Sequence, residues 1–449
     1  MVVTSPGFDH QIRGTPARAW REHASWGAGA PLSFDGVDRL IVVGAHPDDE
    51  SLGAGALTAR AVRLGLEVEL VCLTDGERSH PGSPTHTPQD LAARRREEAV
   101  QASRALGVQR VHQLGRPDGL LSGEVDEIVR FLVDLLGDAR RTVVAAPWRK
   151  DGHPDHEAAG HAAATACRRT GARLWEYPIW FWHWAAPEDA PWTSFSCVPV
   201  SIEAGRAKQE AIMAHASQVS PLSELAGDEV LLDAWMLAHF ADGPEHIIAS
   251  DPTALPDDDL EQLHAREQDP WGTDTRWYEH RKRALVLAAL PRARFRSTLE
   301  LGCSTGALAH SLAGRSEQTV AVDRSPSALD AARRRLTEVP GATAVQLDVP
   351  EEWPTGVFDL VVVSELGYFL SPQALDALVR RVHGSLSDDG TVVLCHWRHP
   401  VEGWVLDAAA VHRAFEQADE LPPVQARVVE RDFEIVVLAP QDTWPESTR

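Results

Sequence analysis

The chain has 449 residues, more than one hydrophobic core usually serves, so two or three domains are expected. Its 43% hydrophobic and 24% charged residues exclude a disordered or collagen-like chain. The net charge of −23 disfavours nucleic acids and anionic membranes as partners, because both would be repelled, and favours a neutral or cationic small substrate.

Five cysteines are scattered singly, without the paired spacing of a metal site or the density of a disulfide scaffold. This usage predicts a reducing, cytoplasmic setting. Residues 1–26 lack a charged lead followed by an apolar core, and no window is long and apolar enough to span a bilayer. We therefore expect a protein that is neither exported nor membrane-spanning. The sequence does not determine the oligomeric state, and a homo-oligomer is one of the alternatives.

The first half of the chain alternates strands and helices as a parallel α/β sheet does. The expected strands are 40–45, 67–73, 108–114 and 142–146, and the expected helices are 52–64, 88–106, 123–136 and 157–169. The Pro- and Gly-rich loop 77–89 is interpreted as a mobile lid. We interpret the aromatic cluster within residues 174–192 as part of the hydrophobic core, and the alternative is a platform that binds substrate.

Two histidine motifs follow two of these strands. His46-Pro47-Asp48-Asp49 comes directly after the strand 40–45, and His153-Pro154-Asp155-His156 comes shortly after the strand 142–146. Open parallel sheets place their ligands at the carboxyl ends of strands. The alternative is a solvated turn whose acidic residues cap the next helix.

Two histidines and a carboxylate are a common catalytic zinc set, so His46, Asp49 and His156 are candidate ligands of Zn²⁺ or another divalent metal. Asp48 would then be the general base that takes a proton from water, whose pKa the metal lowers. His153 would face the substrate carbonyl and help to stabilise the oxyanion.

The paired motifs resemble the PIG-L/LmbE-like family of zinc N-deacetylases, which remove acyl groups from amino sugars and related glycosides. The resemblance covers roughly residues 38–220. It includes the further segments Thr74-Asp75-Gly76-Glu77, Arg95 with Glu98, Gly115-Arg116-Pro117-Asp118-Gly119, and Lys208 with Ala214-His215-Ala216-Ser217-Gln218. It implies the same three metal ligands and the same base. For Arg95, Asp75 and Asp118, a buried ion pair or cap is as good an interpretation as substrate contact.

A stretch rich in Asp, Glu and Pro, residues 242–274, is interpreted as the linker between domains. The expected division is 1–245, an acidic linker 246–265, and 266–449. After the linker the alternation returns, with strands at 297–301, 318–323, 343–347, 358–364 and 391–396, helices at 276–290, 306–314, 327–338 and 373–386, and an antiparallel edge at 424–429 and 433–438. The fold class is therefore α/β, with two Rossmann-like domains, each a mostly parallel sheet flanked by helices.

The segment Glu300-Leu301-Gly302-Cys303-Ser304-Thr305-Gly306 is a strand that enters a glycine-bearing turn. Its spacing does not match the dinucleotide fingerprint with three glycines. Asp323 ends the next strand and can accept both ribose hydroxyls, while Asp348 follows the third strand and can reach an adenine amine.

This order resembles class I S-adenosylmethionine-dependent methyltransferases over about residues 265–400. Ser304 stands where many members have glycine, which weakens the motif. The resemblance implies S-adenosylmethionine as cofactor, with donor contacts from Glu300, Gly302, Cys303, Gly306, Asp323, Asp348, Ser364, Trp271 and Tyr278. A structural Rossmann-like unit is the alternative.

The flanking segments Asp269-Pro270-Trp271, Trp277-Tyr278-Glu279 and 358–368 resemble nodulation-type N-methyltransferases, which methylate the free amine of a deacetylated amino sugar. Glu365, Tyr368 and His396 are candidates for placing the acceptor, with a cap or interface role as the alternative. The two halves together predict a bifunctional enzyme that deacylates an amino sugar or glycoside and N-methylates the freed amine. O-methylation at another position, or a non-catalytic donor-binding module, are the alternatives.

Overall fold

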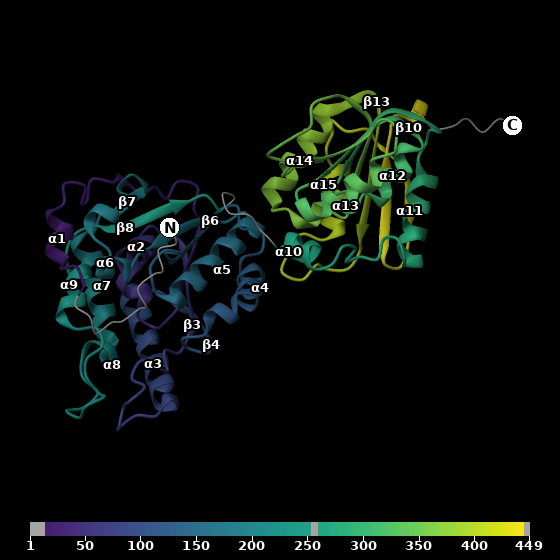
Figure 1. The fold of residues 1–449 in the computed structure, drawn as a ribbon. Helices are drawn as coiled ribbons and strands as arrows, with labels where there is room; N and C mark the ends of the chain where they lie inside the picture. Colours follow the sequence, from purple (N-terminus) through teal and green to yellow (C-terminus); the bar gives the residue numbers. More distant parts are fainter. Residues whose placement is uncertain (1–13, 253–258, 444–449) are drawn as a thin grey trace. The chain divides into compact units, whose positions relative to one another are not determined.

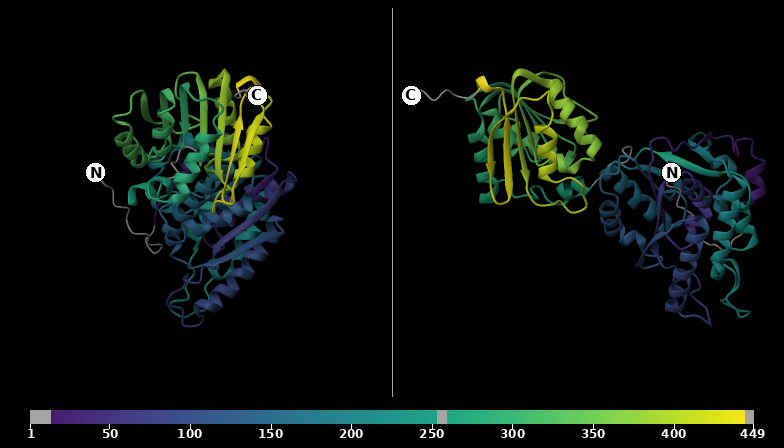
Figure 2. Two further views of the ribbon diagram at one scale, coloured as in Figure 1. Left: turned by 90° about the vertical axis from the view of Figure 1, so that its right-hand side faces the viewer. Right: turned by 180° about the vertical axis from the view of Figure 1, so that it is seen from behind.

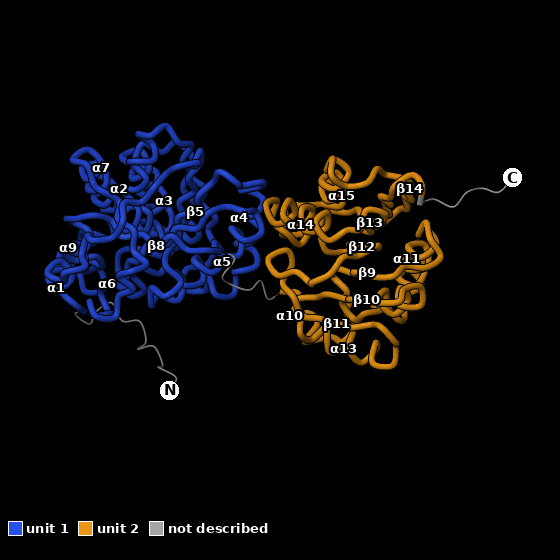
Figure 3. Tube along the Cα trace, turned by 90° about the horizontal axis from the view of Figure 1, so that it is seen from above, with its two compact units in different colours: residues 1–255 blue, residues 256–449 orange. Residues whose placement is uncertain are grey.

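The computed structural model describes residues 14–252 and 259–443 of the chain. The chain forms two compact units, residues 1–255 and 256–449 (Figure 3). Each unit is a mostly parallel sheet flanked by helices (Figures 1 and 2). The predicted α/β class with two Rossmann-like domains is confirmed.

The first unit contains an eight-stranded sheet in the order β1-β7-β8-β6-β5-β2-β3-β4. Its strands are β1 (Ala30–Pro31), β2 (Arg39–Gly44), β3 (Glu67–Thr74), β4 (Arg110–Arg116), β5 (Thr142–Pro147), β6 (Arg173–Tyr177), β7 (Phe195–Val198) and β8 (Glu245–Ser250). Strand β2 lies between β3 and β5 and is buried from Leu40 onward, which explains its unbroken apolar run.

The helices of this unit are α1 (Ala17–Glu22), α2 (Asp49–Arg63), α3 (Pro88–Leu106), α4 (Val125–Leu136), α5 (Pro154–Thr170), α6 (Phe181–Trp184), α7 (Ile202–Ala214), α8 (Ala216–Val219) and α9 (Ala234–Ala241). Helix α3 matches its expected range, because Thr87 and Asp90 form a capping box and the left-handed Gly107 ends it. Helices α2 and α5 begin about three residues earlier than expected. The first histidine motif therefore forms the turn that leads into α2, with Asp49 as the first helical residue, and the second motif forms the N-cap and first turn of α5.

The expected linker 246–265 is wrong along most of its length. Residues Glu245–Ser250 form β8, which pairs antiparallel with both β6 and β7 inside the first sheet. Asp259–Arg266 form helix α10 of the second unit. The first four residues of β8 are buried, which makes this strand part of the core despite its acidic neighbours. Part of the acidic run lies outside the described residues.

The aromatic segment after β6 is core, as predicted. Tyr177, Phe181 and Trp182 are buried in the main cluster of the first unit, and Trp182 packs edge-on against the fully buried Trp20. Only the last member, Trp184, is exposed. This segment closes one side of the candidate site described below.

The second unit has seven strands in the order β11-β10-β9-β12-β13-β15-β14. They are β9 (Phe295–Leu301), β10 (Ser316–Asp323), β11 (Ala342–Gln346), β12 (Phe358–Ser364), β13 (Leu386–Trp397), β14 (Val424–Val429) and β15 (Phe433–Leu438). Strand β15 runs antiparallel to β13 and β14, so the predicted antiparallel edge is confirmed.

The helices of the second unit are α10, α11 (Trp277–Ala289), α12 (Ala307–Ala313), α13 (Pro326–Leu336), α14 (Pro372–Ser385) and α15 (Ala408–Glu416), the last of which was not expected. Short 3-10 helices occur at Leu121–Gly123, Pro187–Asp189, Trp192–Ser194, Gly367–Phe369 and Gln441–Thr443. In the described ranges, no helix combines the length and apolar character needed to cross a bilayer.

Candidate active sites

The carboxyl ends of β2 and β5 bring the two histidine motifs together, because these strands are parallel neighbours. Asp49 lies between the two imidazoles. Its Oδ2 is 3.8 Å from His46 Nδ1, and its Oδ1 is 3.2 Å from His156 Nε2. One ligand atom from each of these three residues could hold a metal ion together.

The opposite nitrogen of each imidazole is held by a carboxylate. His46 Nε2 lies 3.1 Å from Asp118 Oδ1 and 3.3 Å from Asp155 Oδ2. His156 Nδ1 lies 2.7 Å from Asp151 Oδ2. Such outer carboxylates fix the tautomer and orientation of a metal-ligating imidazole.

The residues present fit a metal ion by a second observation. The Nε2 atom of His156 is fully buried and lies 3.2 Å from Asp49 Oδ1, but the two atoms are not aligned for a hydrogen bond. Buried polar atoms are nearly always hydrogen-bonded, so this arrangement needs an explanation. A cation between His46, Asp49 and His156 would bind both atoms.

Asp48 is buried beside this cluster, in a left-handed backbone conformation with φ of 133°. Its Oδ2 accepts a hydrogen bond of 3.1 Å from Arg95 Nη2. Burial raises the pKa of Asp48 to about 6, although the Arg95 charge opposes the shift. A carboxyl group whose pKa lies near neutrality is suited to take up and release a proton.

His153 caps helix α5, because its Nδ1 accepts a hydrogen bond of 3.2 Å from the Asp155 amide. Burial lowers the pKa of His153 to about 2, and the neighbouring imidazoles of His156 and His46 add to this effect. The ring is therefore neutral at pH 7. Since Nδ1 accepts, Nε2 carries the proton and is the donor that a developing oxyanion would need.

Asp151 is a residue that the sequence did not single out. Its Oδ1 accepts the backbone amides of Ile179 and Phe181 at 2.7 and 3.0 Å, and its Oδ2 accepts the amide of Trp180 at 3.0 Å. The buried aromatic segment thus holds the carboxylate that orients His156. The only signal in the sequence was an acidic residue two positions before the second motif.

The loop interpreted as a mobile lid is fastened by hydrogen bonds. The Asp228 carboxylate accepts the hydroxyls of Ser83, Thr85 and Ser223, which joins this loop to residues 220–229. His80 Nε2 also lies 3.0 Å from the Glu229 carbonyl oxygen. Hydrogen bonds therefore hold the loop 77–89 and the loop 220–229 together, although the two are distant in sequence.

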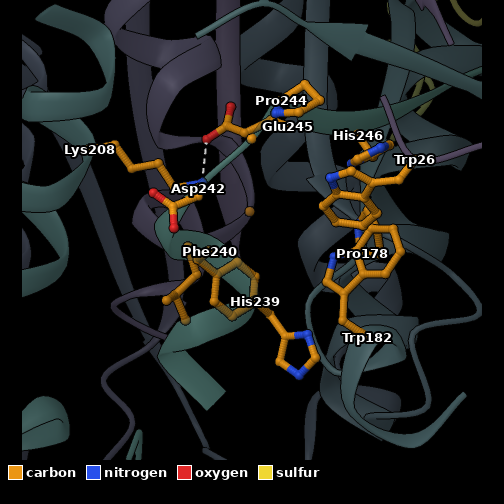
Figure 4. Close-up of a pocket in the computed structure, with 13 residues that line it drawn as sticks. Trp26, Pro178, Trp182, Lys208, His239, Phe240, Asp242, Pro244, Glu245 and His246 are labelled. Atoms are coloured by element: carbon orange, nitrogen blue, oxygen red, sulfur yellow. Dashed lines mark hydrogen bonds and ion pairs between the residues drawn. The ribbon is translucent and has the colours of Figure 1, made fainter. Parts of the chain in front are cut away.

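A pocket of about 30 Å³ lies elsewhere in the first unit (Figure 4). The candidate metal ligands are not among its lining residues. The buried pair Lys208 and Glu245, 2.8 Å apart, forms one wall, and Trp26 and Trp182 lie on another side. Glu245 also accepts the amides of Ala56 and Leu57, just after the kink in α2. This arrangement caps the second half of α2, and the pocket has room for only a few water molecules.

In the second unit, β9 ends in the glycine turn. Gly302 has φ of +78°, and a Cβ atom there would lie 3.0 Å from the Ser364 carbonyl oxygen, so glycine is required. Ser304, which replaces the expected glycine, has φ of +47°. Its amide donates to Asp323 Oδ2 at 2.7 Å, and the Ser325 amide donates to Oδ1 at 2.9 Å.

Glu300 and Asp323 lie close enough to influence each other. Burial raises the pKa of Glu300 to about 8, and the charge of Asp323 adds to the rise. Glu300 Oε2 is buried and makes no hydrogen bond among the described residues. Cys303 is buried in the turn, and Gly306 precedes α12 with φ of +75°. An open acceptor beside the turn fits a ligand that brings its own donors.

The other expected donor contacts are more exposed than the residues of the turn. Asp348 is half-buried after β11, and its amide donates to Glu352. Trp271 is exposed and Tyr278 half-buried. Thr273 Oγ1 lies 3.0 Å from Thr305 Oγ1, which ties the segment of Trp271 to the glycine turn.

The three candidates for placing the acceptor, Glu365, Tyr368 and His396, differ in their hydrogen-bond partners and burial. Tyr368 Oη donates to Glu365, whose Oε2 also accepts the Trp397 amide at 2.9 Å. His396 is fully buried, with Nε2 3.3 Å from the Gly367 amide nitrogen and Nδ1 3.0 Å from His412 Nε2. Because both ring nitrogens have protein partners, the expected substrate contact of His396 does not agree with the geometry.

The fold and the two sites define the class: a two-domain α/β enzyme with a histidine–aspartate site at one sheet and a glycine turn followed by an acidic strand end at the other. The family model described as GlcNAc-PI de-N-acetylase (PIG-L) matches residues 41–167, and the model described as nodulation protein S (NodS) matches residues 256–428. The chain therefore joins a domain of the PIG-L family to a domain of the NodS family, both of them enzyme families.

Two curated proteins and a solved structure illustrate these matches. A 1D-myo-inositol 2-acetamido-2-deoxy-alpha-D-glucopyranoside deacetylase of Streptomyces scabiei is 34% identical over 34% of this chain and 58% of its own length. Nodulation protein S of Rhizobium tropici is 33% identical over 32% of this chain and 61% of its own length. The crystal structure of a methyltransferase-like protein from Pseudomonas syringae is 41% identical, with 36% of this chain and 99% of that chain covered and a TM-score of 0.33. The chain spans about half the length of the curated deacetylases it matches.

Proposed function

We propose that the chain is a bifunctional enzyme. Its first unit hydrolyses an N-acyl group, in the first instance N-acetyl, from an amino sugar or glycoside, and its second unit N-methylates the freed amine with S-adenosylmethionine. The observation that carries the proposal is the Asp49 carboxylate held between His46 and His156, with the buried Asp48 beside it. The NodS match of the second unit supports the methylation step.

In the first step, Asp48 removes a proton from water as the water oxygen bonds to the amide carbonyl carbon. His153 Nε2–H stabilises the oxyanion, and the proton then passes to the departing nitrogen as the C–N bond breaks. The products are a carboxylate and a free amine. His46, Asp49 and His156 would hold Zn²⁺ or another divalent ion, which when bound polarises the carbonyl and lowers the pKa of water.

In the second step, the neutral amine attacks the donor methyl group. The N–C bond forms as the S–C bond breaks, S-adenosylhomocysteine leaves, and the new ammonium loses one proton to solvent. Asp323 would accept the ribose hydroxyls, and the glycine turn would let the donor approach the backbone. Methyl transfer depends mainly on alignment and on an unprotonated amine, so placement of the acceptor matters more than a strong base.

The substrate class rests on the relatives. The Streptomyces scabiei protein is named for a 2-acetamido-glucopyranoside of inositol, and a relative of Thermococcus kodakarensis, 30% identical, is named diacetylchitobiose deacetylase. We propose an N-acetylglucosamine-type ring for this chain, with its aglycone unassigned. A cytoplasmic setting is part of the proposal, supported by five cysteines that are all free and buried.

The test is product analysis with the purified full-length chain, a divalent metal, S-adenosylmethionine and N-acetylglucosamine or a glycoside of it. We expect a product that has lost the acetyl group and gained methyl on nitrogen, with free amine as the intermediate. Methylation of the intact N-acetyl substrate would instead support O-methylation. Deacetylation without any methyl transfer, even when free amino sugar is supplied, would leave the second unit as a non-catalytic module.

A further inference from the structure

Lys282, on helix α11, is an enclosed charged residue near the acceptor candidates of the second unit. Its Nζ lies 2.7 Å from Glu365 Oε1 and 3.1 Å from Glu279 Oε1. The Lys282 side chain is 12% exposed, whereas that of Glu365 is 27% exposed. Lys282 therefore stands behind Glu365, and the accessible side of the pair is the carboxylate.

Glu365 has one acceptor position left. A carboxylate offers about four lone-pair sites. Lys282 Nζ, Tyr368 Oη and the Trp397 amide use three of them. The residue also has φ of +53°, a backbone conformation that costs energy outside glycine. The surrounding contacts hold this strained residue with one site open.

The pair borders both the donor turn and an aromatic surface. Glu365 follows Ser364, whose carbonyl oxygen packs against Gly302 of the turn. Lys282 Nζ lies 5.3 Å from the centre of the Tyr278 ring, which meets the exposed Trp397 edge-on at 6.0 Å. Aromatic faces of this kind suit the apolar face of a sugar ring.

We propose that Lys282 is a positioning residue for methyl transfer: it holds Glu365 toward the acceptor amine and offsets its charge, so that the bound amine stays unprotonated. The inference rests on the proposed N-methyltransferase function. An unbalanced carboxylate next to an amine favours the ammonium form, which cannot attack the methyl group. With Lys282 between two carboxylates, the cluster carries one net negative charge instead of two.

Other titratable groups around the pair leave this balance undisturbed near neutral pH. They are Tyr278 and Glu279 on α11, Tyr368 after β12, Cys395 and His396 on β13, and His412 on α15. Burial raises the pKa of Cys395 and of both tyrosines and lowers the pKa of His396 and His412, so these groups are neutral around pH 7. Among the groups named here, Glu279 alone is charged at pH 7, and it is already counted in the cluster.

The experiment measures kcat for methyl transfer against pH, with free glucosamine as acceptor so that deacetylation is bypassed. The rising limb of this profile reports the pKa of the bound amine. In Lys282→Met the limb should move to higher pH, and in Glu365→Gln it should move to lower pH. A limb that moves by one pH unit changes kcat below the limb about tenfold. Lys282→Arg should leave the limb close to its wild-type position.

S-adenosylhomocysteine affinity and thermal unfolding of each variant provide the control for folding. If Lys282→Met lowers kcat equally at all pH values, or if Glu365→Gln moves the limb in the same direction as Lys282→Met, the positioning role is overturned while the proposed function stands. If Lys282→Met does not fold, the direction of the Glu365→Gln shift still decides. If the wild type transfers no methyl to any free amino sugar, the proposed function fails, and the role of Lys282 fails with it.

Discussion

The two units hold their charged groups in different ways. In the first unit the side chains of His46, Asp49 and His156 are 12%, 3% and 0% exposed, and each imidazole has a carboxylate behind it. In the second unit the side chains of Asp348 and Glu365 are 44% and 27% exposed. The three candidate metal ligands of the first site are thus enclosed and held in place, whereas two of the candidate residues of the second site are partly open to solvent.

Each site also contains a buried atom that makes no hydrogen bond among the described residues. In the first unit it is a nitrogen, His156 Nε2, and in the second it is an oxygen, Glu300 Oε2. A nitrogen lone pair between carboxylates calls for a cation, while a carboxyl oxygen beside a backbone turn calls for donors from a ligand. The following experiments test whether the two sites work independently and in these different ways.

The largest effect is expected for Asp48→Asn, which removes the proposed base. Deacetylation should fall by about 10²- to 10⁴-fold, because the amide cannot accept the proton from water. Methylation of free amino sugar by the same protein should not change. Mass spectrometry of both products checks this, with Asp138→Asn, in an exposed ion pair, as the matched control. Equal loss of both activities would contradict the independence of the two sites.

Asp323→Ala should have the converse effect. The carboxylate would lose its bonds to the ribose, and each charge-assisted bond is worth about 1.5–3 kcal/mol, so the Kd for S-adenosylhomocysteine should rise at least about tenfold. Isothermal titration calorimetry measures the Kd, and Asp330→Ala, on the surface of α13, is the control. Unchanged affinity would remove Asp323 from the donor site, and altered deacetylation would be equally unexpected.

Asp151→Asn tests whether the first site depends on its outer carboxylates. The amide of the variant is a weaker acceptor for His156 Nδ1–H than the carboxylate is. The His156 imidazole therefore becomes less basic and is less firmly oriented as a metal ligand. Metal affinity should fall by about 10- to 100-fold. Metal content after dialysis against a graded chelator gives the affinity. Full retention of metal would show that Asp151 serves only to anchor the amides of 179–181.

Glu300→Gln tests stability and its pH dependence instead of a product or a binding constant. The folded state holds the Glu300 proton up to a pKa of about 8, above the ordinary value of 4.5, so this contribution is complete at low pH and is lost as pH rises from about 4.5 through 8. The wild-type melting temperature should therefore fall over this range. The variant should show a flatter curve and exceed the wild type above pH 8. Parallel curves in differential scanning fluorimetry, without added donor, would contradict the assignment.

Local sequence signals predicted most elements well. Helix 88–106 was predictable because its capping box and its terminal glycine are local signals, formed by residues at the two ends of the helix itself. The strands around 40–45 and 358–364 were predictable because both faces are buried and their apolar runs are unbroken. Strand β8 was not predictable from the sequence, because the acidic residues around it are typical of a linker. It is a strand because it pairs with β6 and β7.

The sequence by itself determined the two motif pairs, the order of strands and helices, and the residues able to bind metal or donor. Only the tertiary structure decided which acids stand behind which ligands. Asp118, Asp151 and Asp155 take these places because parallel strand ends and an aromatic loop converge there. The structure also shows that His396 is buried and that Lys282 pairs with Glu365, neither of which the sequence indicated. Such contacts join residues separated by up to about a hundred positions, and spacing along the chain carries no information about them.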